Sequence, residues 1–301
     1  MENKQGILLE SGTNELELVE FKVGKNAYGI NVIKVKEILQ PLPLTMIPHS
    51  HDHIEGIVQL RGEVLPVVNM ANVLGTAFHS PENEQKFIVA EFNGQRVIFH
   101  VDQVSKIHRF TWNDIEKPSE MYQGASSQII GVIKMGAEML LLLDFEKIIV
   151  DINPSTGIQV GDITKLGPRE RSSKSILVAE DSPLLRKLIQ ETLDAAGYSH
   201  LTFFENGEDA FSYLESIVNT KSDIAEHVQL VITDIEMPRM DGHTLTRKIK
   251  DDARLEKLPV LIFSSLITND LRHKGEQVGA QEQVSKPEIA ELVMKIDQYI
   301  L

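Results

Sequence analysis

Short segments in which hydrophobic residues either alternate with polar ones or form brief apolar runs recur through the first half of the chain, which predicts β-strands. These segments lie at residues 16–23, 54–69, 87–101 and 129–144. Turn residues divide them into hairpins, most clearly at Asn93-Gly94, a pair typical of two-residue hairpin loops. Residues 32–39 instead repeat apolar positions at helical spacing and predict a short helix or turn. Many short strands at regular spacing predict an all-β domain, as one barrel or paired barrels.

The second half of the chain has a different pattern, in which short apolar runs alternate with amphipathic helical segments. The runs lie at residues 175–179, 200–204, 230–232 and 259–263, and residues 282–285 predict a weak fifth strand. Five strands alternating with five helices predict an α/β domain with a doubly wound five-stranded parallel sheet. The chain therefore contains two domains of different fold class.

Between these two patterns the periodicity disappears and Pro, Gly and charged residues accumulate. We predict a loose N-terminus at 1–15, an all-β domain at 16–155, a linker at 156–174 and the α/β domain at 175–301. Each predicted domain is long enough to bury its own hydrophobic core.

Composition narrows the possible functions. The chain has 301 residues, a formal net charge of -14 and no cysteine. The acidic balance disfavours binding to nucleic acid, and the lack of cysteine excludes disulfides. There is no signal sequence at the N-terminus and no apolar run long enough for membrane insertion, so we expect a cytoplasmic protein.

Polar side chains follow the predicted strands of the second half, where each strand ends. The residues at these ends are Glu180, Asp181, Asp234, Ser264 and Lys286. Since the carboxyl ends of parallel strands meet at one edge of a sheet, we expect these groups to converge. Three carboxylates at close range repel one another unless a cation lies between them, and Mg²⁺ is the hard cation most suited to such oxygen ligands. Lysine and hydroxyl groups suit a bound phosphoryl group, which an aspartate can accept as nucleophile.

This set of residues, with Met237-Pro238 and Asp241-Gly242 after the acceptor, resembles the response-regulator receiver family over roughly residues 175–301. The resemblance implies that Asp234 is the phosphoacceptor. It also implies that Asp181 and Asp234 bind Mg²⁺, with Glu180 nearby and the main-chain carbonyl of Glu236 as a further ligand. In that family the hydroxyl, here Ser264, moves toward the phosphoryl group, and the lysine, here Lys286, pairs with it.

Two positions depart from the common receiver pattern. Many receivers carry an aromatic residue three positions before the lysine, where this chain has Gln283. A signal carried by an aromatic side chain swinging inward is therefore in doubt. Glu236 lies two residues after the acceptor, and we hypothesise that its carboxylate slows or redirects the water that removes the phosphoryl group. An unchanged dephosphorylation rate in Glu236→Gln would refute this.

The first half resembles the CheW family of chemotaxis coupling proteins over roughly residues 16–150. The most specific segment is Leu60-Arg61-Gly62 followed by an apolar strand with an internal proline. The resemblance implies paired small β-barrels that bind chemoreceptor cytoplasmic tips and the CheA histidine kinase. Val35, Glu37 and Arg61 match family positions at those contacts, although each also has an ordinary structural role available. The histidines of 49–53 allow a metal site, but a solvated loop is the favoured interpretation.

Together the two halves resemble CheV-type proteins, in which a CheW-like domain is fused to a receiver. The favoured function is a chemotaxis adaptor that is regulated by, or acts as a sink for, phosphorylation of Asp234, and that is not an enzyme. One alternative is an aspartate-nucleophile phosphatase of the haloacid dehalogenase type, faintly suggested by Asp234-Ile235-Glu236. That family has a second Asp, not Glu, and places its nucleophile on the first strand of the domain. Another alternative is a structural adaptor with an inactive receiver.

Overall fold

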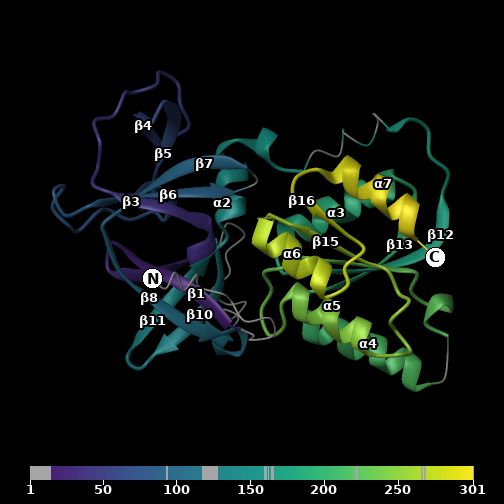
Figure 1. The fold of residues 1–301 in the computed structure, drawn as a ribbon. Coiled ribbons are helices and arrows are strands. Elements are labelled where there is room, and N and C mark those ends of the chain that lie inside the picture. The colour runs from purple at the N-terminus through teal and green to yellow at the C-terminus, as the bar shows by residue number, and fades with distance from the viewer. Residues whose placement is uncertain are drawn as a thin grey trace, which may run out of the picture.

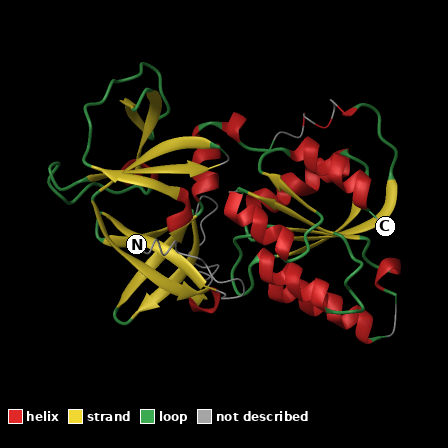
Figure 2. Cartoon of the chain, in the orientation of Figure 1, coloured by secondary structure: helices red, strands yellow, loops and turns green. Residues whose placement is uncertain are grey.

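The structure is a computed structural model that describes residues 15–92, 94–116, 128–158, 161, 163, 166–220, 223–265, 267 and 269–300. It contains a strand-rich domain formed by the first half of the chain and a mixed domain formed by the second, which lie side by side (Figure 1). The division is clear in Figure 2, where the long helices gather in the second domain. No helix in the described ranges is long and apolar enough to cross a membrane.

Two sheets form the first domain. One has the order β8-β1-β2-β11-β10-β9 and the other the order β3-β6-β7-β5-β4. The strands of the first sheet are β1 (Glu15–Val23), β2 (Asn26–Asn31), β8 (Gln103–Thr111), β9 (Ile115–Glu116), β10 (Ile129–Met135) and β11 (Glu138–Leu143). Those of the second are β3 (Val35–Leu39), β4 (Ile54–Leu60), β5 (Glu63–Asn69), β6 (Lys86–Phe92) and β7 (Gln95–Val101). The all-β prediction is confirmed, with the two-residue β9 as a sixth strand in the first sheet.

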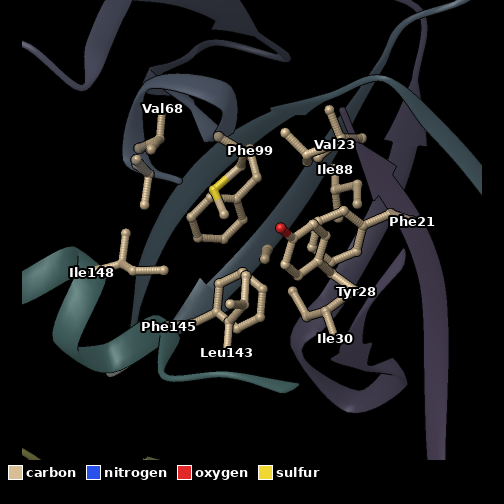
Figure 3. Packing of buried hydrophobic residues seen from close by; sticks show 14 of the residues in the cluster. Phe21, Val23, Tyr28, Ile30, Val68, Ile88, Phe99, Leu143, Phe145 and Ile148 are labelled. Carbon is tan, nitrogen blue, oxygen red and sulfur yellow. The ribbon is translucent and has the colours of Figure 1, made fainter. Parts of the chain in front are cut away.

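The hydrophobic core of this domain joins its two sheets. Phe21 and Tyr28 come from the first sheet and Phe99 from the second, while Phe145 comes from helix α2 (Phe145–Ile152) (Figure 3). The ring centroids of Phe99 and Phe145 lie 5.0 Å apart. Burial of one such side chain contributes about 1.5–3 kcal/mol, so this cluster holds the two sheets together as one domain.

The predicted helix over residues 32–39 is only partly correct. A 3₁₀ turn, η1 (Val32–Lys34), is followed by strand β3, which pairs antiparallel with β6. Half-buried and exposed side chains alternate along β3, because pairing with β6 fixes a period of two there. The predicted hairpin over 54–69 is confirmed as β4 and β5, and its corner residues Arg61 and Gly62 have φ of +49° and +91°. The remaining short helices are α1 (Met70–Val73), η2 (Trp112–Asp114) and η4 (Pro154–Thr156).

The second domain has a parallel sheet of order β13-β12-β14-β15-β16. Its strands are β12 (Ser172–Ala179), β13 (Tyr198–Phe204), β14 (Leu230–Thr233), β15 (Val260–Ser264) and β16 (Glu282–Ser285). The last four residues of β12, 176–179, and all of β14 are buried on both faces of the sheet, which explains their continuous apolar runs in the sequence.

Helices cover both faces of this sheet, so the doubly wound prediction is confirmed. One core cluster contains side chains of α3 (Pro183–Ala195) and α7 (Ile289–Tyr299). The cluster on the other face contains side chains of α4 (Gly207–Asn219) and α5 (Gly242–Asp251). Helix α6 (Asn269–Gln277) packs beside β16, and the short η6 (Ile224–Glu226) follows α4.

The segment between the domains includes residues that pack into a hydrophobic core. Ile158 and Ile163 are buried in the hydrophobic core of the second domain, and β12 begins at Ser172. The predicted linker over 156–174 thus contains residues that pack against the second domain. The domain limits given above stay a prediction.

Candidate phosphoacceptor site

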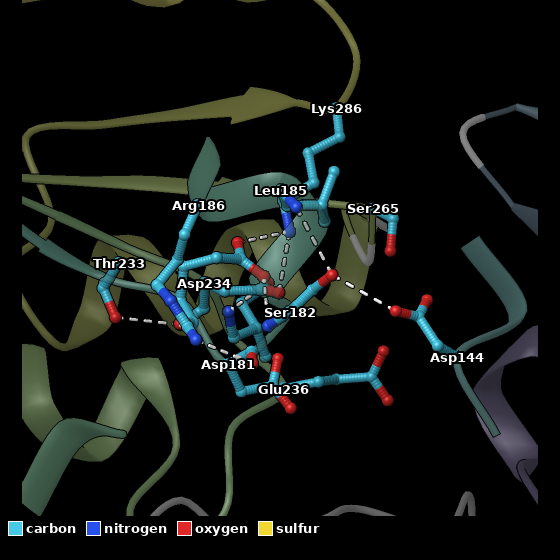
Figure 4. A network of polar contacts seen from close by, with 12 residues as sticks. Asp144, Asp181, Ser182, Leu185, Arg186, Thr233, Asp234, Glu236, Ser265 and Lys286 are labelled. Carbon is cyan, nitrogen blue, oxygen red and sulfur yellow. Dashed lines mark hydrogen bonds and ion pairs between the residues drawn. The ribbon is translucent and has the colours of Figure 1, made fainter. Parts of the chain in front are cut away.

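The parallel register of the sheet brings the polar strand ends together. In the pairing of β12 with β14, Ala179 lies opposite Thr233, so Glu180 and Asp234 follow at equivalent positions. In the pairing of β15 with β16, Ser264 lies opposite Ser285, and Lys286 comes next. These side chains therefore reach one edge of the sheet, as Figure 4 shows for Asp181, Asp234 and Lys286.

Three carboxylates lie close together at this edge. Ligand oxygens of Glu180, Asp181 and Asp234 all lie within 4.8 Å of one another. Burial raises the pKa of Glu180 to about 8, although the neighbouring Lys286 opposes the shift. Burial and repulsion from Glu180 and Asp234 also raise the pKa of Asp181 well above its usual range. Without a cation, ionising all three acids is therefore costly.

Lys286 connects two of these acids. Its Nζ donates hydrogen bonds to Glu180 Oε2 and Asp234 Oδ2, each at 2.8 Å. Burial disfavours its charge, but Asp234 and Glu180 outweigh burial and raise its pKa well above the usual range. The other oxygen of Asp234, Oδ1, accepts a hydrogen bond from the Ile235 main-chain N–H at 2.6 Å. The Asp234 carboxylate is thus held at both oxygens.

The acid cluster fits a hard divalent cation. Mg²⁺ prefers oxygen ligands and binds through one or two carboxylates with water or phosphate oxygens completing its shell. The carboxylates of Glu180, Asp181 and Asp234 provide such a set. Among the residues described here, no other group of three histidine or acidic side chains lies within reach of one ion, so the histidines of 49–53 do not form such a group.

Replacing Asp181 with asparagine is expected to raise the free energy of unfolding in EDTA by roughly 1–3 kcal/mol, because it removes a charge that burial and its acidic neighbours disfavour. Excess Mg²⁺ should stabilise the wild type and have little effect on the variant. Urea denaturation in both conditions measures this. Asp194→Asn, at an exposed position in α3, is the matched control and should change stability by less than about 0.5 kcal/mol. A less stable Asp181→Asn in EDTA would contradict the expectation.

Two further receiver positions are buried. Ser264 is the last residue of β15 and is fully buried. Gln283 is also buried, and its Nε2 donates to the main-chain carbonyl of Arg272 in α6 at 2.7 Å. A Cβ on Gly275 of α6 would lie 2.3 Å from the Gln283 amide oxygen. The amide side chain is therefore packed tightly against α6, in the place where many receivers have an aromatic ring.

The first domain also contributes to this site, and the sequence did not predict its contribution. Asn31 Nδ2 donates to Glu236 Oε1 at 2.6 Å, and Lys34 Nζ lies 3.7 Å from Glu236 Oε2. Ser182 Oγ donates to Asp144 Oδ2 at 3.2 Å. Burial raises the pKa of Glu236, and Lys34 opposes that shift. The sequence shows only that Lys34 lies between the apolar residues Ile33 and Val35, which does not by itself indicate a contact.

The predicted partner-binding residues lie away from the acid cluster, on the second sheet. Val35 and Glu37 are on β3, and Arg61 is at the corner between β4 and β5. Val35 packs against the domain core. Arg61 Nη2 lies 2.8 Å from Glu37 Oε2, with 79% of the Arg61 side chain exposed. An ion pair this exposed stabilises a fold little, so both charges remain available to a partner.

The fold and the acid cluster define a class of protein in which an all-β coupling domain is joined to a phosphoacceptor receiver domain. The family model of the CheW-like domain matches residues 17–153, and that of the response regulator receiver domain matches residues 176–297. Chemotaxis protein CheV3 of Helicobacter pylori is 31% identical over 280 residues, covering 89% of both chains. Chemotaxis protein CheV2 of the same organism is 28% identical over 297 residues and covers 93% of both. Chemotaxis protein CheW of Thermotoga maritima is 30% identical over 152 residues, which are 50% of this chain and 98% of that protein.

The chain belongs to the CheV family of chemotaxis proteins. The resemblance found in the sequence is thereby confirmed for both halves. The all-β domain is from here on called the coupling domain, and the α/β domain the receiver.

Proposed function

We propose that this protein is a chemotaxis adaptor that couples chemoreceptors to the CheA histidine kinase and is regulated by phosphorylation of Asp234. The observation that carries the proposal is the set of contacts around Asp234. Its carboxylate lies beside Glu180 and Asp181 and is held by Lys286, on the same chain as a CheW-like domain. The protein is not an enzyme in this proposal. It accepts and loses its own phosphoryl group.

The residues of the receiver have distinct parts in this chemistry. The Asp234 carboxylate attacks the phosphorus of a phosphohistidine, the P–N bond breaks, and the electron pair returns to the imidazole nitrogen. Glu180, Asp181 and Asp234, with the main-chain carbonyl of Glu236, would hold Mg²⁺, which offsets negative charge on the phosphoryl oxygens. Lys286 would pair with the phosphoryl group, and the Ser264 hydroxyl would donate a hydrogen bond to it.

The coupling domain offers a surface for protein partners beside Glu37 and Arg61. Val64, three residues after Arg61, is 61% exposed, and Ile38, which follows Glu37 on β3, is 43% exposed. Exposed apolar side chains beside a weak ion pair are typical of a protein-binding surface. We assign contacts with CheA and with the receptor tips to the region of Val35, Glu37 and Arg61.

Transfer of radiolabel from phosphorylated CheA kinase in the presence of Mg²⁺ tests the proposal. The wild type is expected to take up label and Asp234→Asn to take up none, because the amide cannot act as the nucleophile. Asp209→Asn, a carboxyl at the start of α4, is the matched control and should accept label as the wild type does. Circular dichroism of each variant checks that it is folded.

The same assay separates the alternatives. Absence of transfer to a folded wild type would favour a structural adaptor with an inactive receiver. Turnover of a small phosphomonoester would favour the aspartate-nucleophile phosphatase. That alternative has little structural support, because Asp234 follows the central strand β14 and the Glu236 carboxylate accepts a hydrogen bond from Asn31.

A further inference from the structure

A short segment of the coupling domain, Asn31–Lys34, touches the receiver at its phosphorylation face. Asn31 caps the 3₁₀ turn η1, since its Oδ1 accepts a hydrogen bond from the Ile33 main-chain N–H at 3.0 Å. The other end of the same side chain donates to Glu236 across the domain boundary, at 2.6 Å. The side chain of Ile33 packs against a small receiver cluster of Ile235, Ile262 and Leu271. Both polar and apolar contacts therefore fix this segment on the receiver.

Lys34 extends the contact toward the acceptor. It is 3% exposed, and its Nζ lies 4.7 Å from the centroid of the Phe92 ring. That Nζ donates to Ser265 Oγ at 2.5 Å and lies 3.7 Å from Glu236 Oε2. Ser265 directly follows Ser264, the hydroxyl that is expected to turn toward a phosphoryl group. A cation of the coupling domain is thus connected to the part of the receiver that should move on phosphorylation.

Residues of both domains also line a partly open cavity around the acceptor. This cavity, about 110 Å³ in volume, is lined by Asp181, Asp234 and Glu236 of the receiver and by Asp144 and Glu146 of the coupling domain. Asp234 is only 6% exposed. Coupling-domain residues at this cavity narrow the approach to Asp234, and they hinder the histidine of a folded phosphodonor domain more than a small molecule.

We propose that residues 31–34 form a latch that holds the coupling domain over the phosphorylation site, that the closed arrangement shields Asp234 from a protein phosphodonor, and that phosphorylation favours opening. The inference rests on the proposed function, since it takes a kinase domain as the donor. At constant Mg²⁺, phosphorylation changes the acceptor from one negative charge to nearly two. The added charge faces Glu236 and, from the coupling domain, the acids Asp144 and Glu146 and one cation, Lys34. Acids predominate around the acceptor, so the added charge disfavours closure. Movement of Ser264 also pulls Ser265 away from Lys34.

The latch residues are directly followed in the chain by the strand that carries predicted partner-binding residues. Lys34 is followed at once by β3, which carries Val35 and Glu37 and lies at the edge of its sheet. Release of residues 31–34 frees the end of this strand from the receiver. Phosphorylation of Asp234 would thereby change how the coupling domain presents these residues to its partners.

The variant Asn31→Asp tests the latch with little change of shape. It keeps the oxygen that caps η1 and replaces the donor that faces Glu236 with a carboxylate oxygen, which repels it. Transfer from phosphorylated CheA is expected to become roughly tenfold faster, the scale of one lost hydrogen bond to a charged group. Phosphorylation by acetyl phosphate should change less than about twofold, because this donor enters the closed cavity. Asn26→Asp, at the exposed start of β2, is the control.

Two further variants strengthen the design. Lys34→Met keeps an unbranched side chain of similar length and removes the charge that lies over the Phe92 ring, so it should also accelerate transfer from CheA. Lys25→Met in the exposed first hairpin turn should not. In the double variant Asn31→Asp with Glu236→Gln, the new amide can donate to the new carboxylate. It should therefore return the ratio of the CheA rate to the acetyl phosphate rate toward that of Glu236→Gln alone.

Distances between the domains test the latch without any phosphotransfer. The chain has no cysteine, so spin labels can be placed at Lys106→Cys and Ser212→Cys, both exposed positions on opposite domains. Pulsed electron paramagnetic resonance should show a longer and broader distance distribution for Asn31→Asp, and for the wild type treated with Mg²⁺ and beryllofluoride. Identical distributions, or equal acceleration with both donors, would overturn the latch. If neither donor phosphorylates Asp234, the proposed function fails, and the distances in the untreated proteins still decide the latch.

Discussion

Replacing Lys286 with methionine is expected to lower the free energy of unfolding of the receiver by about 3–5 kcal/mol in the absence of Mg²⁺. The Lys286 side chain is 1% exposed, and its two partners Glu180 and Asp234 are 2% and 7% exposed. Removing the cation leaves two buried acids without their shared donor. Methionine preserves most of the side-chain volume, so the decrease in unfolding free energy comes from removal of the charge and not from a cavity.

Urea denaturation of the full chain measures this effect with two signals. Trp112 is the only tryptophan and lies in the coupling domain, so its fluorescence follows that domain. The long helices are in the receiver, so far-ultraviolet circular dichroism follows mainly the receiver. We expect the dichroism transition to shift strongly and the fluorescence transition to shift less. Lys295→Met removes a partly exposed ion pair with Glu282 and should cost less than about 1 kcal/mol.

The same variant should also lose phosphorylation. A preorganised cation at the phosphoryl group typically contributes a factor of about 10²–10³ to rate. Initial rates of label transfer from CheA to folded Lys286→Met, below its denaturation midpoint, should therefore fall by at least about a hundredfold. A variant that is as stable as Lys295→Met and is phosphorylated at the wild-type rate would show that Lys286 has neither role.

The receiver was predictable because its chemistry follows from local patterns. Each polar residue of the site lies at or just after the end of a predicted strand, as Asp234 follows β14 and Lys286 follows β16. Once the runs are taken as parallel strands, the sheet edge itself brings the residues together. The all-β fold of the coupling domain was predictable for a similar reason, since alternation and turn residues define its hairpins.

The contact between the domains could not be predicted in this way. It depends on Asn31, which precedes the segment 32–39, and on Lys34, which lies within it. The spacing in this segment suggested a helix, whereas the chain forms a 3₁₀ turn and then β3. Their partners, Glu236 and Ser265, are more than two hundred residues away in the chain. No periodicity connects such residues, and an asparagine that caps a turn has the same local signature whether or not its amide reaches another domain.

This contact gives a physical reason to expect the two domains to communicate. In a receiver, phosphorylation is expected to make only two local changes: it adds negative charge at the acceptor, and it moves one hydroxyl. In this chain, Glu236 and Ser265 lie next to the groups expected to change, and each accepts a hydrogen bond from the coupling domain. Since a ligand shifts an equilibrium only through differential contacts with its two states, the bonds at residues 31–34 are where such a difference can arise.

Acidification is expected to destabilise the receiver through His243 in α5. This side chain is 2% exposed, and within the described residues its Nε2 has no hydrogen-bond partner. Burial, together with the positive charge of Lys274, lowers the pKa of His243 from 6.5 to about 4, although Asp241 opposes the shift. The folded receiver therefore keeps the imidazole neutral at a pH where the unfolded chain protonates it.

The sign of the effect follows from proton binding. Above pH 6.5, His243 is neutral in both the folded and the unfolded state, so it does not affect stability. Between pH 6.5 and 4 only the unfolded chain binds the proton, so the free energy of unfolding decreases as the pH is lowered. At pH 5 the loss is about 2 kcal/mol, from 1.36 kcal/mol per pH unit. His243→Gln is expected to remove this part of the pH dependence, measured as the difference in unfolding free energy between pH 7.5 and pH 5. His200→Gln, at an exposed position of β13, should leave it in place. If His243→Gln lost as much stability as the wild type on acidification, the imidazole would have to be protonated within the folded receiver, and the acid sensitivity would belong to other groups.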